Sequence, residues 1–481
     1  MNNDTVILNP LPQSPAAQPL NITMVGTGYV GLVTGICLAE LGAIVTCVDL
    51  SAPKIAALNQ GEIPIFEPGL QPLLLKNQQQ KKISFTTDLS TAVPHADIVF
   101  IAVGTPTDPQ TGEANLQFVF DAAEEIGRCI TSYTVIVTKS TVPVGTNRKI
   151  KECIRAVTDV PFDVASNPEF LREGSAVYDF MHPDRVIIGT ETPRAQALMT
   201  CLYDPLCDEG IPRMRTGLET AEMIKYGANA FLATKIGFIN ELADLCEVTG
   251  ADVREVAKGM GMDKRIGRAF LQTGPGYGGS CFPKDTLALQ KTAENHDISL
   301  KIVTQVIAAN KQRFDNMFAR IVAVCDGTVT DKIIGILGLT FKANTDDTRE
   351  SPAMEIIQRL LDAGAYIQAF DPKGTVPQEE NISALTVMPT GEAVAQKAHA
   401  VVVLTEWAAF TTLDFSKMCA SLSSTLLDKE KPLLDFRNIL DPEMIRQAGF
   451  RYIPLGYTVD PLHHAQIALV NTLEKRDVPE D

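Results

Sequence analysis

Short apolar runs alternate with longer stretches of mixed polarity along the first third of the chain. The apolar runs lie at residues 22–25, 43–48, 96–103, 133–139 and 162–166. Runs that are apolar almost throughout predict strands buried on both faces, as in a parallel sheet. The stretches between them, such as 32–41 and 118–130, have apolar residues at helical spacing. The pattern therefore predicts an α/β sheet covered by helices.

The pattern changes to a single long helix from residue 219. Apolar residues recur at helical spacing up to residue 247, and no proline interrupts the stretch. A helix of this length is expected to bridge two domains and to offer the seam of a dimer.

Apolar runs return in the last third, at 332–339, 366–370, 399–404, 432–436 and 452–455. A helix is predicted at 351–361, with Gly364 in the position of a C′ glycine. These elements predict a second Rossmann-like half. Its glycines are too sparse for a dinucleotide fingerprint, so a substrate nucleotide is the expected ligand.

Composition narrows the class of protein. The chain has 481 residues, which suggests roughly three domains, and 45% of them are hydrophobic, as in soluble globular proteins. A net charge of −16 argues against a nucleic-acid-binding protein. A nucleotide ligand remains compatible with that charge, because anion sites are local and built from backbone amides.

The cysteines and histidines point to a cytoplasmic enzyme without a metal. Ten cysteines occur without a C-x-x-C pair, and six histidines are scattered. We therefore expect reduced thiols and no metal site. Residues 1–20 lack a basic start and a long apolar core, so we expect neither a signal peptide nor a membrane anchor.

A dinucleotide fingerprint opens the first half. Gly26, Gly28 and Gly31 form G-x-G-x-x-G between a predicted strand and a predicted helix, and Asp49 ends the next strand. Gly26 would make the tight turn, Gly28 would admit the pyrophosphate and Gly31 would let helix and strand pack closely. Asp49 would accept hydrogen bonds from the ribose, which favours NAD over NADP. A plain tight turn is the alternative.

Hydroxyl side chains follow two of the predicted strands. Thr105 and Thr107 follow the run at 96–103, and Ser140 and Thr141 follow the run at 133–139. Ligands bind at the carboxyl ends of parallel strands, so these side chains are expected to face the cofactor. Ordinary loop polarity explains any single one of them equally well.

A glycine-rich loop at 276–285 contains the candidate nucleophile, Cys281. The thiol would lie just ahead of a helix predicted at 284–292, with Lys284 nearby, and both features lower a thiol pKa. A buried structural cysteine in a turn is an equally good interpretation of the local sequence.

Four more positions suggest chemistry. Glu169 and Glu173 would share one face if the segment were helical, and one of them would act as a base or orient a water. Two solvated glutamates are the alternative. Lys225 and Asn229 lie one turn apart amid an apolar run, and a solvent-facing pair is the alternative there.

Cations lie near the strand ends of the second half. Lys342, Arg349 and Arg437 are placed where they would hold a diphosphate, although ordinary surface charge explains each one singly.

Taken together, the motifs resemble the UDP-glucose 6-dehydrogenase family, within the wider group of nucleotide-sugar dehydrogenases. The resemblance covers about residues 22–457 and rests on G-T-G-Y-V-G, V-G-T-P-T, K-S-T-V-P, N-P-E-F-L-R-E-G, K-Y-x-x-N-A-F, G-Y-G-G-S-C-F-P-K-D and F-K-x-x-T-x-D-x-R-E-S-P. It implies two Rossmann-like, doubly wound α/β domains joined by a long central helix. The expected parts are a flexible extension at 1–20, an NAD-binding domain at 21–215, a central helical dimerisation domain with the cysteine loop at 216–325, a UDP-sugar-binding domain at 326–470 and a tail at 471–481.

The resemblance also implies the reaction, an NAD-dependent oxidation of UDP-glucose to UDP-glucuronate in two steps and four electrons. Cys281 would form a thiohemiacetal and then a thioester, which water hydrolyses. Lys225 and Asn229 would stabilise oxyanion charge. Asp285 would position water and help proton transfer, with Thr141 and Glu173 near the water, cofactor and sugar.

Site residues carried over from the family fall into two groups. The NAD contacts expected are Gly26, Gly28, Tyr29, Val30, Gly31, Asp49, Lys54, Thr105, Thr141, Glu173, Lys284 and Arg349. The substrate contacts expected are Glu169, Phe170, Leu171, Arg172, Glu173, Lys225, Asn229, Arg265, Phe270, Leu271, Gln272, Thr273, Gly274, Gly278, Lys342 and Arg437. In the family the arginine matched by Arg265 reaches across a dimer interface, so a homodimer is expected.

Two features depart from the family's pattern. The N-terminal extension is longer than the family needs, and Phe436 precedes Arg437 where glycine is common, which puts the pose of Arg437 in doubt.

Three rival functions remain at this point. A sister enzyme acting on GDP-mannose or a UDP-N-acetylhexosamine usually has a different cysteine loop, so Tyr277-Gly278-Gly279-Ser280 favours UDP-glucose. A β-hydroxyacid dehydrogenase would oxidise once, with no need for Cys281. An NAD-binding regulator with a decayed site is disfavoured by the complete set of Cys281, Lys225, Asn229 and Asp285.

Overall fold

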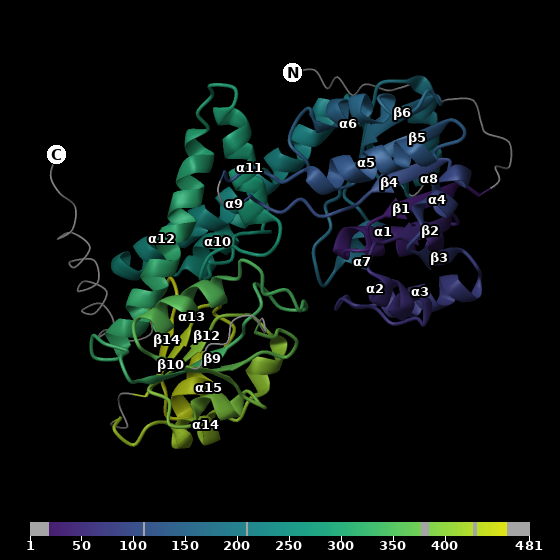
Figure 1. The fold of residues 1–481 in the computed structure, drawn as a ribbon. Helices are drawn as coiled ribbons and strands as arrows, with labels where there is room; N and C mark the ends of the chain where they lie inside the picture. The colour runs from purple at the N-terminus through teal and green to yellow at the C-terminus, as the bar shows by residue number, and fades with distance from the viewer. Residues whose placement is uncertain (1–18, 109–110, 208–209, 377–383, 427–430, 459–481) are drawn as a thin grey trace.

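The computed structural model describes residues 19–108, 111–207, 210–376, 384–426 and 431–458. Two sheets, each covered by helices, are joined by a bundle of long helices (Figure 1). The predicted tail at 471–481 and nearly all of the predicted extension at 1–20 lie outside the described residues.

The first sheet has eight strands in the order β3-β2-β1-β4-β5-β6-β7-β8. They are β1 (Asn21–Val25), β2 (Ile44–Val48), β3 (Ile83–Thr86), β4 (Ile98–Ile101), β5 (Thr134–Thr138), β6 (Phe162–Ser166), β7 (Val186–Thr190) and β8 (Arg213–Thr216). The first six follow the strand order of a dinucleotide-binding fold, whose ligand lies where the order reverses, between β1 and β4. The predicted strands are all present, with ends that differ by at most two residues.

One strand pair departs from the parallel sheet that the sequence predicts. β6 and β7 are antiparallel, whereas β7 and β8 are parallel again. The connection from β6 to β7 consists of a loop and one short helix, α7. Because β7 begins at the sheet edge where β6 ends, the loop after β6 stays at the edge where the ligand is expected.

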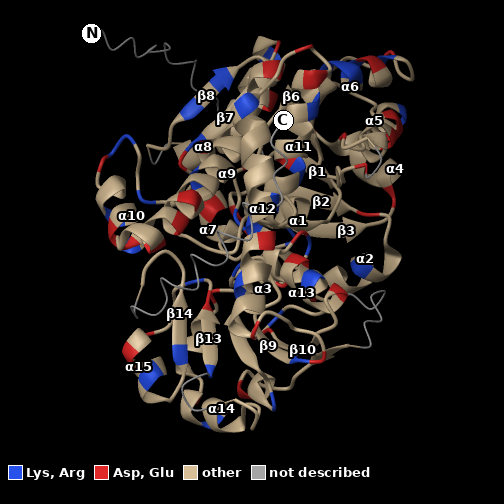
Figure 2. Ribbon diagram, turned by 90° about the vertical axis from the view of Figure 1, so that its left-hand side faces the viewer, with Lys and Arg blue, Asp and Glu red and all other residues tan. Residues whose placement is uncertain are grey.

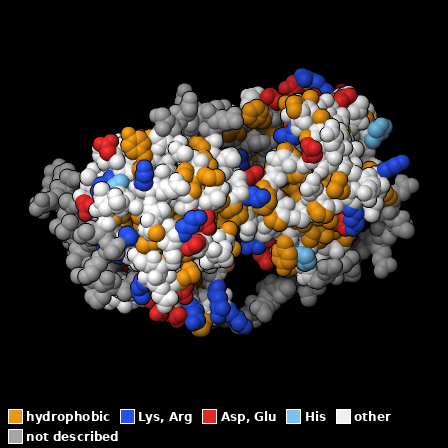
Figure 3. Space-filling view, turned by 90° about the horizontal axis from the view of Figure 1, so that it is seen from below, with side chains coloured by type: hydrophobic (Ala, Val, Ile, Leu, Met, Phe, Trp, Pro, Cys, Tyr) orange, Lys and Arg blue, Asp and Glu red, His pale blue; other side chains and the backbone are white. Residues whose placement is uncertain are grey.

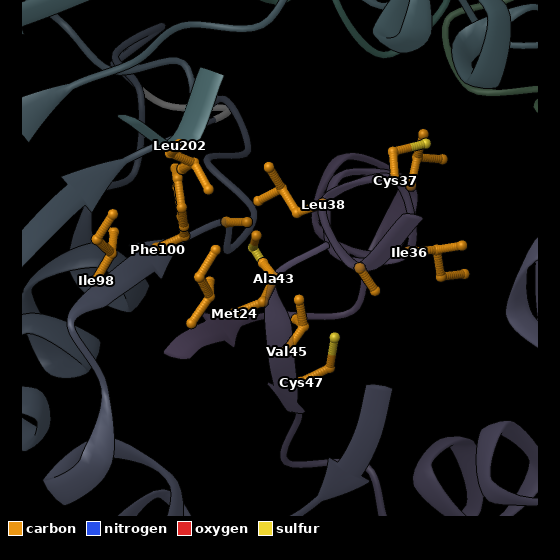
Figure 4. Close-up of a cluster of buried hydrophobic side chains, with 14 of the residues drawn as sticks. Met24, Ile36, Cys37, Leu38, Ala43, Val45, Cys47, Ile98, Phe100 and Leu202 are labelled. Carbon is orange, nitrogen blue, oxygen red and sulfur yellow. The ribbon is translucent and has the colours of Figure 1, made fainter. Parts of the chain in front are cut away.

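The helices around this sheet are α1 (Tyr29–Glu40), α2 (Ala52–Asn59), α3 (Leu70–Gln79), α4 (Leu89–Ala92), α5 (Gln117–Cys129), α6 (Thr146–Arg155), α7 (Ala176–Met181) and α8 (Pro193–Cys207), with the 3-10 turn η1 (Val93–His95). α1 is buried along most of its length. Figure 4 shows Leu38 of α1 beside Met24 of β1 and Val45 of β2 in the core of this half.

Long helices connect the two sheets. They are α9 (Leu218–Thr249), α10 (Val253–Gly261), α11 (Phe282–Glu294) and α12 (Lys301–Val324). The long helix predicted at 219–247 is confirmed as α9, which ends at Gly250 in the left-handed conformation. α9 packs against α11 and α12, and it also contacts β6 and β7 of the first sheet. Side chains on α9 can therefore meet residues from both neighbouring parts.

The second sheet is entirely parallel, in the order β11-β10-β9-β12-β13-β14. Its strands are β9 (Ile333–Leu337), β10 (Tyr366–Phe370), β11 (Leu385–Val387), β12 (Ala400–Val403), β13 (Pro432–Asp435) and β14 (Arg451–Pro454). Around it lie α13 (Pro352–Asp362), α14 (Phe415–Ser421), α15 (Pro442–Gln447), η2 (Glu392–Ala395) and η3 (Ala408–Thr412). The order repeats that of the first six strands of the other sheet, which confirms a second Rossmann-like half. The domain boundaries given above stay a prediction.

Charged residues lie mainly on the surrounding helices. In Figure 2 the strands β1 and β2 are tan, whereas α5 and α10 carry blue and red segments and α2 a blue one. The face in Figure 3 has hydrophobic side chains in small groups between charged ones. Among the described residues, no helix combines the length and apolarity needed to cross a bilayer.

Candidate active site

The glycine fingerprint forms an open turn at the start of α1. Gly26 has a φ of +99°, and a Cβ there would lie 2.6 Å from the carbonyl oxygen of Ala102. A Cβ on Gly31 would lie 2.0 Å from the carbonyl oxygen of Gly26, so both positions require glycine. A Cβ on Gly28 would meet nothing within 4 Å. The turn thus leaves room beside the first turn of α1, where backbone N–H groups attract anions.

Asp49 lies beside this turn as a carboxylate. Its oxygens accept hydrogen bonds from the backbone N–H and hydroxyl of Thr27 (2.9 and 2.7 Å) and from the backbone N–H of Ser51 (3.0 Å), and Lys54 pairs with it at 3.0 Å. Burial alone would raise the pKa of Asp49, but these hydrogen bonds lower it to about 2. A fixed negative charge here suits ribose hydroxyls and repels a 2′-phosphate.

The loops after β4 and β5 meet at the carboxyl edge of the first sheet. The hydroxyl of Thr105 donates to the carbonyl oxygen of Thr141 at 3.0 Å, and the hydroxyl of Ser140 donates to that of Val103 at 2.6 Å. Thr107 pairs with Ala114 in an isolated bridge within its own loop. Thr105 and Thr141 are therefore held next to each other at the carboxyl edge of the sheet.

Cys281 lies at the N-terminus of α11 and lines a cavity of about 700 Å³. Several of the predicted substrate residues line the same cavity: Glu169, Phe170, Leu171, Arg172, Lys225, Asn229 and Phe270. The expectation of a lowered thiol pKa is wrong. Burial raises the pKa of Cys281 to about 11, and the charges of Lys225 and Lys284 only partly offset it. The helix terminus does not decide the outcome, because the buried thiolate loses its hydration.

Lys225 and Glu169 form a buried ion pair on the wall of the cavity. The ammonium and carboxylate are 2.8 Å apart, and each side chain is 5% exposed. The solvent-facing interpretation of Lys225 is therefore wrong. Burial would raise the pKa of Glu169, but the charge of Lys225 lowers it below its ordinary value. Burial would lower the pKa of Lys225, but nearby negative charges, Glu169 first, raise it, so both groups are charged.

Asn229 and Asp285 face each other across α9 and α11. The side-chain amide of Asn229 donates to the Asp285 carboxylate at 2.6 Å, and both residues are buried. Lys284 pairs with the other carboxylate oxygen. The amide group has a second hydrogen and Lys225 has further N–H groups, so donors remain for a ligand in the cavity.

Glu173 is not on a helical face with Glu169. The segment from 167 to 172 is a loop without a helical turn, so the two acids do not share a helical face. The two carboxylates point to different partners. Glu169 pairs with Lys225, whereas Glu173 accepts from the hydroxyls of Thr345 (2.7 Å) and Ser280 (3.4 Å).

Glu173 has an unusual charge state. Burial and the charge of Asp347 raise the pKa of its carboxyl to about 7, although Thr345, Arg349 and Lys342 lower it. The solvated-glutamate interpretation is wrong for both acids, since Glu169 is 6% exposed and the Glu173 side chain 11%. A carboxyl with a pKa near neutral pH, hydrogen-bonded to the residue before Cys281, can take up or release a proton.

The loop after β9 packs onto the cysteine loop. A Cβ on Gly278 would lie 2.0 Å from the carbonyl oxygen of Glu350, and one on Gly279 would meet the ring of Phe341 at 2.8 Å. Gly274 lies against Arg437, whose guanidinium donates to the carbonyl oxygens of Leu404 (2.8 Å) and Phe341 (2.9 Å). Arg437 is therefore fixed next to the predicted substrate loop, even with Phe436 before it.

The second sheet has an acid like Asp49, but its hydrogen bonds are filled. Asp371 ends β10 and accepts from the backbone of Leu339 and Thr340, the Thr340 hydroxyl and the indole N–H of Trp407. The backbone N–H groups of residues 373 and 374 bind its other oxygen. All of these donors belong to the second half itself, so Asp371 holds the loops after β9, β10 and β12 together.

The structure does not bring every predicted residue to the cavity. Arg265 pairs with Asp263 and its side chain is 89% exposed. Leu271 is buried, and Thr273 donates to Asn240, so these two shape the loop. Gln272 is exposed. Their contacts with a substrate stay a prediction.

Sequence reasoning missed Lys139 at the cavity wall. Its ammonium is buried and donates to the side-chain oxygen of Asn167 at 2.9 Å. Burial lowers the pKa of Lys139 to about 8, although Glu169 raises it. A lysine that ends an otherwise apolar strand was the available signal.

Comparison with known proteins identifies related chains. Residues 20–207 match the NAD binding domain of the UDP-glucose/GDP-mannose dehydrogenase family, 219–312 its central domain and 335–442 its UDP binding domain. UDP-glucose 6-dehydrogenase from Rhizobium meliloti (strain 1021) is 47% identical over 91% of this chain and 99% of its own length. The Rickettsia typhi (strain ATCC VR-144 / Wilmington) enzyme of that name is 44% identical with the same coverage. A solved UDP-glucose dehydrogenase from Pyrobaculum islandicum has a TM-score of 0.83 and 33% identity, covering 93% of this chain and 100% of that one.

The raised pKa of Glu173 makes a prediction about stability. Between its ordinary pKa of 4.5 and about 7 the folded state keeps a proton that the unfolded state releases, so stability falls as pH rises through this range. Glu173→Gln removes that penalty. We expect the variant to gain roughly 1–3 kcal/mol over the parent between pH 5 and pH 8.5, measured by urea unfolding. Glu62→Gln, at an exposed site, is the control, and a pH-independent difference for Glu173→Gln would contradict the assignment.

Proposed function

The chain belongs to the UDP-glucose/GDP-mannose dehydrogenase family, and we propose that it oxidises UDP-glucose to UDP-glucuronate through a thioester on Cys281. It is an NAD-dependent oxidoreductase. The relatives named UDP-glucose 6-dehydrogenase support the substrate, because they match along nearly their whole length. The observation that carries the proposed chemistry is one cavity lined by Cys281, the Lys225–Glu169 pair and Asn229, whose side chain is hydrogen-bonded to Asp285.

The first crevice fits NAD. Gly28 leaves space beside the start of α1 for a diphosphate, and Asp49 is ionised beside it to bind ribose hydroxyls. Thr105 and Thr141 lie at the carboxyl ends of the next strands, where the rest of the cofactor would lie. When bound, NAD accepts a hydride from C6 of the sugar.

The first oxidation removes a hydride from C6 and a proton from the C6 hydroxyl, and it leaves an aldehyde. Negative charge develops on the C6 oxygen. The ammonium of Lys225 and an amide hydrogen of Asn229 stabilise this charge, and they do so strongly because the site is shielded from solvent. Asp285 takes up the proton through water and is held ready by Asn229.

The second oxidation needs the thiol. Cys281 adds to the aldehyde carbon, a C–S bond forms, and the sulfur's proton passes to the C6 oxygen, giving a thiohemiacetal without change of oxidation state. Loss of a second hydride from C6 and of the hydroxyl proton gives the thioester. Because the thiol is protonated at rest, it reacts once the aldehyde is beside it and its proton has an acceptor.

Hydrolysis completes the cycle. Water adds to the thioester carbon, the C–S bond breaks, the sulfur takes up a proton and C6 leaves as a carboxylate. Glu173, with its pKa near 7, accepts the proton of the attacking water from its place beside Ser280. Each substrate has then lost two hydrides, which reduce two NAD molecules.

The UDP end of the substrate is assigned to the loops between the halves. Lys342 and Arg437 supply positive charge, and the backbone of the 270–278 loop lies against Arg437. A single-step dehydrogenase would have no use for the cysteine among these groups, so this alternative is disfavoured. The ten cysteines, all free thiols, suit an enzyme of the cytoplasm.

A homodimer is part of the proposal. Phe231, Phe238 and Leu245 recur every seven residues on α9, and their exposed fractions are 66%, 48% and 55%. Large apolar side chains exposed in a row on one helix suit a seam with a second copy of the helix. The exposed Arg265 would reach the partner's substrate site from there.

Sedimentation equilibrium measures the oligomeric state. We expect twice the chain mass for the parent protein and the mass of a single chain for Phe238→Glu. The introduced carboxylate would be buried in the apolar seam without a partner charge, and this cost disfavours association. Val387→Glu is the matched control at an exposed site of the second sheet and should stay dimeric. A parent protein of single-chain mass would refute the dimer.

The stoichiometry of cofactor reduction tests the reaction. We expect two NADH for each UDP-glucose consumed, measured by absorbance against product analysis. Cys281→Ser should lose steady-state turnover, because an alkoxide is formed less readily than a thiolate and leaves less readily. Cys201→Ser, a free thiol on α8, is the control and should keep full activity. One NADH per substrate, or an active Cys281→Ser variant, would overturn the covalent route.

A further inference from the structure

Glu67 is a buried carboxylate that the mechanism above does not use. It lies in the connection between α2 and α3 and is 7% exposed. One oxygen accepts from the hydroxyl of Tyr29 and from the backbone N–H of Gly174 at 2.7 Å. The other accepts from the backbone N–H of Ala176 at 2.8 Å.

Every described partner of this carboxylate is a donor. An ionised carboxyl only accepts hydrogen bonds, so it suits partners that all donate. A glutamine at this position would place its NH₂ group, a donor, against one of these N–H or O–H donors. Burial raises the pKa of Glu67 above its ordinary value, and the backbone hydrogen bonds together with the charge of Lys342 only partly offset this. Ser175, the N-cap residue of α7, makes no side-chain hydrogen bond to the start of the helix. Glu67 instead accepts the backbone N–H groups of Gly174 and Ala176 and so fixes this segment.

The contacts connect two functional parts. Tyr29 is the first residue of α1, directly after the glycine turn. Its hydroxyl also accepts from the backbone N–H of Gly174 at 3.0 Å. Gly174 follows Glu173, has a φ of +79°, and would place a Cβ 2.4 Å from the carbonyl oxygen of Asn344. The turn at 173–174 is therefore held between the cofactor helix and the loop that carries Thr345.

We propose that Glu67 is a positioning residue for the reaction, which ties the turn carrying Glu173 to the first turn of the cofactor helix. Glu173 reaches Ser280 and Thr345 only from this turn, so the clamp sets where its carboxyl lies relative to Cys281. The inference rests on the proposed function for the role of Glu173. A clamp that served stability alone would leave the charge state and chemistry of Glu173 unchanged.

A double-mutant cycle separates these two roles without cofactor or substrate. Glu173→Gln is introduced into the parent and into Glu67→Gln, and urea unfolding is measured at pH 5 and 8.5. Asp347, Arg349 and Lys342 face Glu173, and its proton affinity depends on burial among them. If Glu67 positions the turn, Glu173 gains solvent in Glu67→Gln, and the pH-dependent gain from Glu173→Gln shrinks at least twofold. An undiminished gain overturns the proposal.

Turnover gives the second readout. We expect Glu67→Gln to lower kcat about 10- to 100-fold, because catalytic groups tolerate little displacement. In the parent, kcat should fall as the pH drops below about 7, because Glu173 becomes protonated. In Glu67→Gln, the pH at which kcat falls should move down toward the ordinary pKa of a glutamate. Tyr29→Phe should change kcat in the same direction by less, and it keeps the test open if Glu67→Gln does not fold. Glu62→Gln, exposed in the same connection, should match the parent.

The outcomes distinguish this inference from the proposed function. A parent protein that does not reduce NAD with UDP-glucose refutes the function. An active parent whose Glu67→Gln and Tyr29→Phe variants keep the parent's kcat and pH profile refutes the role of Glu67 alone.

Discussion

Two opposite charges, on Lys225 and Glu169, lie 2.8 Å apart almost without solvent, and the arrangement of the site depends on them. Burying either charge alone costs several kcal/mol, so each is retained only with the other. The pair joins α9 to the loop after β6, and this fixes the central helix against the cofactor-binding sheet. It also leaves a permanent ammonium facing the cavity that Cys281 lines.

The same burial explains why the thiol is at rest in its protonated form. Desolvation outweighs the attraction of Lys225 and Lys284, so the thiolate is disfavoured until a reaction partner arrives. A protonated thiol is a poor target for oxidation and alkylation. In the proposed mechanism, the positive charge of Lys225 stabilises the C6 oxygen as it becomes negative, and it does not lower the thiol pKa below its ordinary value.

Much of the fold follows from local patterns, and the deviations have physical causes. A strand that is covered on both faces is apolar at almost every position, so it is visible in the sequence as a short apolar run. The ends of β1, β4 and β9 were therefore predicted to within two residues. The antiparallel placement of β7 and the turn that carries Glu173 depend on tertiary contacts and not on a local pattern. The partners of Glu173 lie at Ser280 and Thr345, more than one hundred residues away, and no local spacing reveals them.

Site residues were predictable where a motif fixes their backbone. Asp49 and Cys281 are examples, since a strand end and a helix start determine their places. The net pKa of Cys281 was not predictable, because it depends on burial and on charges from α9, from the loop after β6 and from α11 itself. Glu67 gave no signal at all. Its partners are backbone N–H groups and a tyrosine hydroxyl, which leave no pattern in the sequence.

The covalent step is the central claim, and trapping the acylated cysteine tests it most directly. Glu173→Gln should slow hydrolysis more than either oxidation, so the thioester accumulates. Acid quenching after mixing with UDP-glucose and NAD, followed by digestion and mass spectrometry, should show the peptide of Cys281 heavier by one UDP-glucuronyl group. The adduct should be absent in the double variant that carries Cys281→Ser together with Glu173→Gln. No adduct in the Glu173→Gln variant, while the parent forms two NADH per substrate, would contradict the account.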